Sequence, residues 1–178
     1  MRKRQLLERA SIGALAGIAA GLLAGAGARI AMRMVADGVV DAVRRLPEFT
    51  LEGTAGIIIA GAIVGAPFGV IFEAIRERIP APARWRGVIF SAVWLVLIGP
   101  FFFSGEEFFT QGRIVLFALL FPIYGIALGL ALAPSRRIAT AMPLALQAIP
   151  ATIALVGGGL VTIGVVSLAL QSTGLLPM

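Results

Sequence analysis

The 178-residue chain contains no cysteine and no histidine. The first absence excludes disulfides, thiolate metal ligands and a cysteine nucleophile, and the second excludes imidazole-ligated metal or haem. We therefore expect no metal site, no cofactor and no catalytic residue of these kinds. Charge is also scarce, because only 13% of residues are charged while 59% are hydrophobic. Soluble domains carry about twice that charged fraction, so the composition excludes an ordinary water-soluble domain.

Charge is missing from whole stretches of the chain. The uncharged runs cover residues 10–28, 53–72, 87–105, 114–135 and 138–178. A hydrocarbon core of ~30 Å needs about 20 apolar residues in a helix. The sequence thus predicts an all-α integral membrane protein, a single bundle of five transmembrane helices. The predicted spans are about 10–32, 54–75, 86–103, 113–133 and 149–170, with residues 138–148 either interfacial or re-entrant.

The basic residues predict how the chain is threaded. Ten of the fifteen Lys and Arg residues fall in the N-terminal tail and in the links between spans 2 and 3 and between spans 4 and 5. The positive-inside rule places these segments in the cytoplasm, so the N-terminus is expected inside and the C-terminus outside a bacterial cytoplasmic (inner) membrane. The net charge of +6 lies beside the spans. It therefore favours anionic lipid headgroups, and not nucleic acid, as the partner.

The N-terminal segment has an alternative interpretation. A basic start, an apolar run and the sequence Ala24–Gly25–Ala26 or Ala26–Gly27–Ala28 resemble a cleavable signal peptide. The uncharged run is longer than the usual apolar region of such a peptide, which favours a retained span. Cleavage would leave four spans.

Glycine recurs at every fourth position in several predicted spans. Small residues at this spacing let the backbones of two membrane helices approach closely, a pattern called a glycine zipper. We predict helix-packing faces at nine positions: Gly13, Gly17, Gly21, Gly25, Gly61, Gly65, Gly69, Gly125 and Gly129. These faces could nest spans 1 and 2 within one chain, join copies in a homo-oligomer or another membrane subunit, or line a groove.

Polar residues beyond the first glycine row form a candidate cluster on the outer side. Residues 36–46 have the pattern of a short amphipathic helix lying on the membrane surface. Arg29 either extends its guanidinium to the interface or pairs with the carboxylate that opens span 2. The members of the candidate cluster are Arg29, Arg33, Glu52, Glu106 and Glu107.

On the inner side, Glu73 and Glu77 continue the glycine row of span 2 by the same fourfold step. They alternate with Arg76 and Arg78, so we expect local ion pairs there.

Prolines and one tyrosine mark irregular places within the spans. Pro67 and Pro122 each remove a backbone donor and are expected to kink their helices. Tyr124 falls within a span and needs a hydrogen-bond partner or a polar cavity. These three residues are candidates for a solute path. We expect Pro100 at the end of span 3 and Pro150 in the first turn of span 5.

The segment FTLEGTAGIIIAGAIVGAPFGVIFEAIRERIP, followed by an apolar hairpin around SGEEFF, resembles small multi-span proteins of bacterial inner membranes over residues 49–135. This resemblance implies no activity and no catalytic residue. The favoured hypothesis is a non-catalytic membrane protein, a structural or accessory subunit that packs through its glycine faces. The alternative is a small-solute transporter or channel. A membrane enzyme that uses Glu52, Glu106 and Glu107 at the outer interface is the least favoured.

Overall fold

The structure, a computed structural model, describes residues 2–38, 50–103 and 111–172, and this part of the chain is helical with no strand. The elements are α1 (Arg2–Gly38), α2 (Leu51–Ile75), the short 3-10 helix η1 (Arg76–Arg78), α3 (Ala83–Phe102), α4 (Gln111–Ala118), α5 (Leu120–Ala141) and α6 (Leu144–Ser172). Five stretches are long and apolar enough to cross a membrane: Lys3–Met34, Leu51–Arg78, Ala83–Pro100, Ile114–Ala141 and Leu144–Gln171. The all-helical class with five candidate spans is therefore confirmed.

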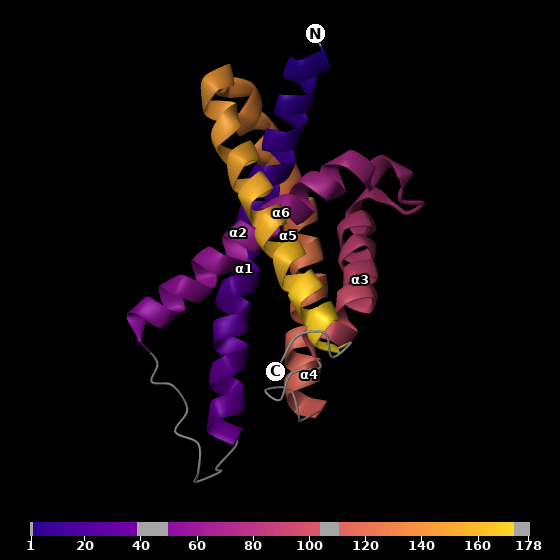
Figure 1. Ribbon diagram of the computed structural model, residues 1–178. Coiled ribbons are helices and arrows are strands. Elements are labelled where there is room, and N and C mark those ends of the chain that lie inside the picture. The colour runs from indigo at the N-terminus through magenta and orange to yellow at the C-terminus, as the bar shows by residue number, and fades with distance from the viewer. Residues whose placement is uncertain (1, 39–49, 104–110, 173–178) are drawn as a thin grey trace.

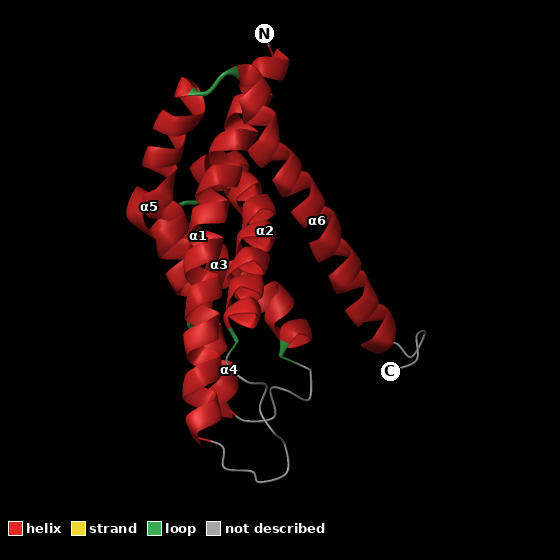
Figure 2. Cartoon of the chain, turned by 90° about the vertical axis from the view of Figure 1, so that its left-hand side faces the viewer, coloured by secondary structure: helices red, strands yellow, loops and turns green. Residues whose placement is uncertain are grey.

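The most extensive helix contact joins α1 to α2, which follows it in the chain. α5 packs against α1 and α3, and α6 packs against α2 and α1. α6 leans away from the other helices toward its C-terminal end (Figure 2). The start of α1 and the end of α6 lie at opposite ends of the bundle (Figure 1). The turn between α5 and α6 lies at the end of the bundle where α1 begins (Figure 1).

The fourth predicted span is two helices, since α4 and α5 meet at Leu119. The break has a local cause in Pro122, whose ring and missing N–H disfavour a helical bond to the carbonyl of Ala118. The backbone on either side stays hydrogen-bonded, from Leu119 N to Val115 O at 3.0 Å and from Ile123 N to Leu119 O at 3.4 Å. The expected irregularity at Pro122 thus lies three residues earlier.

The start of the last span differs from the prediction. α6 begins at Leu144, directly after Pro143, so the expectation that Pro150 lies in its first turn is wrong. Residues 138–141 end α5 and residues 144–147 open α6, with a turn between them. The expected surface helix at 36–46 lies mostly outside the described residues, which include only 36–38, at the end of α1.

The core is built from small side chains with a few aromatic rings. One buried group joins Ala16 and Ala20 of α1 to Phe72 of α2, Phe90 of α3 and Leu128 of α5. The rings of Phe72 and Phe90 are 5.2 Å apart between centroids. Small residues on α1 therefore leave room for aromatic rings supplied by α2 and α3.

Candidate functional site

The glycine rows of α1 and α2 face each other. A Cβ built on Gly13, Gly17, Gly21 or Gly25 would lie less than 3.0 Å from backbone atoms of α2. A Cβ on Gly61, Gly65 or Gly69 would lie equally close to the backbone of α1. Real Cβ atoms do not approach so closely, so no larger residue fits at these positions without moving a helix. The two rows lie backbone against backbone over about three turns.

The remaining predicted glycines have different surroundings. Gly125 of α5 faces Gly87 of α3, and each would collide with the other's carbonyl if it carried a Cβ. Gly129, one turn further, has no atom within 4 Å of a Cβ position. Gly87 was not among the predicted packing residues. Its fourfold spacing to the buried Ser91 is the signal that could have identified it.

α6 packs against α2 next to Pro67. Because proline has no N–H, the carbonyl of Ile63 lacks its usual helical donor. That carbonyl faces Gly157 of α6, where a Cβ would collide with the oxygen and lie 3.2 Å from Pro67 Cδ. A glycine in α6 therefore lets the backbone of α6 pack over this carbonyl.

Tyr124 supplies a polar contact inside the bundle. Its hydroxyl donates to the carbonyl oxygen of Gly65 at 2.9 Å, which ties α5 to α2. Gly65 is a member of the α2 glycine row, so this bond lies beside the α1–α2 contact. Of the three residues proposed for a solute path, Tyr124 bonds to Gly65, two residues before Pro67 in α2, and Pro122 lies in the first turn of α5.

In the C-terminal part of α1, the side chain of Arg29 contacts α2. Its Nε donates to Thr54 Oγ1 at 3.1 Å, and that hydroxyl donates to Thr50 O at 2.9 Å. Arg29 is half-buried, while Arg33 and Glu52 are exposed. Glu106 and Glu107 lie outside the described residues.

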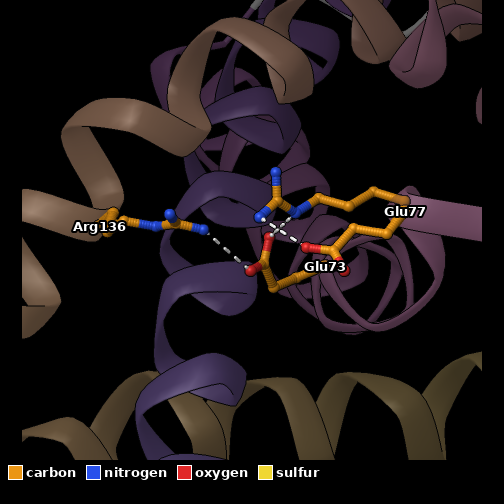
Figure 3. Close-up of polar contacts among 4 residues, drawn as sticks. Glu73, Glu77 and Arg136 are labelled. Atoms are coloured by element: carbon orange, nitrogen blue, oxygen red, sulfur yellow. Dashed lines mark hydrogen bonds and ion pairs between the residues drawn. The ribbon is translucent and has the colours of Figure 1, made fainter. Parts of the chain in front are cut away.

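A buried carboxylate lies at the end of the bundle where α1 begins. Glu73 of α2 is 8% exposed. Its Oε2 lies 2.7 Å from Arg76 Nε, its Oε1 lies 3.5 Å from a terminal nitrogen of Arg136 on α5, and Arg76 also lies 3.7 Å from Glu77. Figure 3 shows the side chain of Arg136 extending from α5 toward the carboxylate of Glu73 on α2. The expected local ion pairs are thus present, whereas the bond to Arg136 was not foreseen.

Two hollows lie at this end of the bundle. The larger, about 630 Å³, lies between α2, α3 and α5, and we call it the basic pocket; its lining includes four arginines, Arg76, Arg86, Arg136 and Arg137. The smaller, about 310 Å³, is lined by Glu73, Glu77, Glu8 and Arg9 among others. Charged side chains from α1, α2, α3 and α5 therefore meet at one end of the bundle.

These features define a helical bundle with five candidate membrane spans and a charged cluster at one end. Comparisons of the chain with protein families, with curated proteins and with solved structures found no match. In the described residues, no three His, Cys, Asp or Glu side chains are grouped to hold a metal ion. The basic pocket carries four guanidinium groups, and guanidinium groups bind carboxylates and phosphates.

Proposed function

We propose that the chain is a non-catalytic integral membrane protein of the bacterial cytoplasmic membrane, a structural or accessory subunit held together by its glycine faces. The observation that carries this proposal is the mutual approach of the α1 and α2 glycine rows. In hydrocarbon, apolar side chains gain little by leaving lipid for another helix, so close backbone packing provides the association. A bundle made in this way is suited to a bilayer.

The outward-facing side chains support insertion into lipid. Leu155 on α6, Val96 on α3 and Leu130 on α5 are 78%, 74% and 73% exposed. Soluble monomers do not expose broad apolar surfaces of this kind. A bilayer would cover these side chains on every helix.

The glycines that remain uncovered indicate where a further subunit would pack. The α1 and α2 rows are occupied by one another, so they do not offer a face to another protein. On α6, a Cβ at Gly159 would meet no atom within 4 Å, and Gly159 lies about 200° around the helix from Gly157, which faces α2. We place the contact with a second copy of the chain on this part of α6. The bond between Tyr124 and Gly65 joins helices, which favours a packing role for Tyr124 over the alternative role in a solute path.

Orientation can be tested directly because the chain has no cysteine. We expect Gln171→Cys, near the end of α6, to react with a membrane-impermeant maleimide in intact spheroplasts. Pro80→Cys, between η1 and α3, should react only after the membrane is permeabilised. Both residues are exposed and uncharged, so the substitutions leave the basic residues in place. The reverse labelling pattern would contradict an inside N-terminus, and labelling of both sites in a detergent-free soluble fraction would contradict membrane insertion.

The subunit contact can be tested in the same cysteine-free background. We expect Gly159→Cys to form a disulfide-linked dimer when native membranes are oxidised, because Gly159 would lie where two α6 helices pack together. Val96→Cys on the exposed face of α3 is the matched control and should stay monomeric. A monomer in both variants would contradict self-association through α6. Equal cross-linking of the two variants would show random collision.

A further inference from the structure

The basic pocket is positively charged at one end. Its lining includes four guanidinium groups, those of Arg76, Arg86, Arg136 and Arg137. The carboxylate of Glu73 lies within ion-pair distance of Arg76 and Arg136, and that of Glu77 lies 3.7 Å from Arg76. Arg86 donates from Nε to the carbonyl of Ala81 at 3.0 Å, a neutral acceptor. Within the described ranges Arg137 has no ion-pair partner. The pocket therefore keeps excess positive charge.

The other part of the pocket is apolar. Leu132 and Ala133 line it one turn before Arg136 along α5, and Gly129 lines it one turn before them. The seven residues from Arg136 back to Gly129 span about 10 Å of helix. The lining therefore extends by this length from the arginines toward the middle of the candidate span. Since no atom lies within 4 Å of a Cβ position on Gly129, the wall is open there. Phe72 of α2 forms part of the same lining.

We propose that the basic pocket binds an anionic membrane phospholipid, with the phosphate held by Arg86 and Arg137 and an acyl chain lying along Ala133 and Gly129. Guanidinium groups match phosphate oxygens in geometry and charge, often through two parallel hydrogen bonds. Basic pockets between membrane helices bind acidic headgroups. The apolar extension distinguishes a lipid from free phosphate, which would use only the arginine end. The inference rests on the membrane insertion proposed above.

The test measures binding of defined probes to the full chain purified in a neutral detergent, by native mass spectrometry. The probes are phosphatidylglycerol, zwitterionic phosphatidylcholine and inorganic phosphate. We expect phosphatidylglycerol to bind at least about tenfold more tightly than either of the others. Arg86→Gln/Arg137→Gln should lower that affinity about tenfold or more. The matched control is Arg78→Gln/Arg84→Gln, which removes the same charge from exposed residues at the same end.

A second pair of variants tests the apolar half. Gly129→Leu fills the open wall while keeping all four arginines, and it should weaken phosphatidylglycerol binding without changing the response to phosphate. Gly56→Leu on α2, where a Cβ also meets no atom within 4 Å, is its control. Melting temperatures establish that each variant is folded.

Each outcome decides the proposal. Equal loss in the two double arginine variants would show diffuse surface charge and overturn it. Phosphate that binds as tightly as the lipid, or an unaltered Gly129→Leu variant, would overturn the lipid assignment. Failure of lipid selectivity with normal cysteine labelling would reject this inference alone, whereas failure of the labelling would reject membrane insertion itself.

Discussion

Gly17→Leu is expected to separate α1 from α2 and to lower the free energy of unfolding by about 3 kcal/mol. Gly17 lies against the backbone of Gly65, where even one added carbon would collide with a carbonyl oxygen. The atoms in the way belong to the main chain, so no side chain can rotate to make room. The only available response is movement of a whole helix, which would also disturb the bond from Tyr124 to the same carbonyl. Unfolding by sodium dodecyl sulfate in mixed micelles, followed by circular dichroism, measures the effect.

Gly56→Leu is the matched control on α2, because nothing lies within 4 Å of a Cβ at that position. It should change the free energy of unfolding by less than about 0.5 kcal/mol. Gly17→Ala should lower the free energy of unfolding by an intermediate amount, because it adds the colliding Cβ but not the rest of a leucine side chain. If Gly17→Leu unfolds at the same detergent fraction as Gly56→Leu, the α1–α2 contact does not stabilise the bundle.

Glu73→Gln is expected to cost about 2 kcal/mol of stability in a neutral detergent. The substitution keeps the shape of the side chain but removes the negative charge that lies between Arg76 and Arg136. Arg136 would then lose its carboxylate partner and Arg76 would keep only the exposed Glu77, while both face two further arginines of the basic pocket. Breaking a fully buried ion pair costs more than this, but the side chain of Arg136 is 54% exposed and water screens part of the loss. Thermal unfolding at low and high salt measures the change, and salt should reduce it.

Glu77→Gln is the control for charge alone, because it removes the same charge from a side chain that is 76% exposed. It should alter stability by less than about 0.5 kcal/mol. Arg136→Gln combined with Glu73→Gln should recover part of the loss, since one unpaired cation is removed with the carboxylate. Equal effects of Glu73→Gln and Glu77→Gln would refute a special role for the buried carboxylate.

Five helices long and apolar enough to span a membrane could be predicted, because long uncharged runs can be read directly along the sequence. Their ends were less predictable. The last span is predicted to begin at 149, whereas α6 begins at Leu144 and includes Gln147 in its first turn. Its amide in fact donates to the carbonyls of Ala139 and Met142 at 2.9 and 3.2 Å, which makes a buried glutamine compatible with the turn.

Only some of the ion pairs around Glu73 could be predicted from the sequence. Arg76 follows Glu73 by three residues, a spacing at which two side chains meet on any helix. Arg136 lies 63 residues beyond Glu73 in the sequence, and no periodicity links them. The pairing of Gly87 with Gly125 depends on the same kind of distant contact. Such contacts can be identified only when the arrangement of the helices in space is known.

The order of contacts also has a consequence for how the chain assembles during synthesis. α1 and α2 are consecutive, so their hairpin can close as soon as the ribosome has delivered the second helix to the membrane. α3 meets α2 through the rings of Phe90 and Phe72, but its main contact is with α5, which is made later. The first two helices therefore provide a finished template onto which the later ones are added.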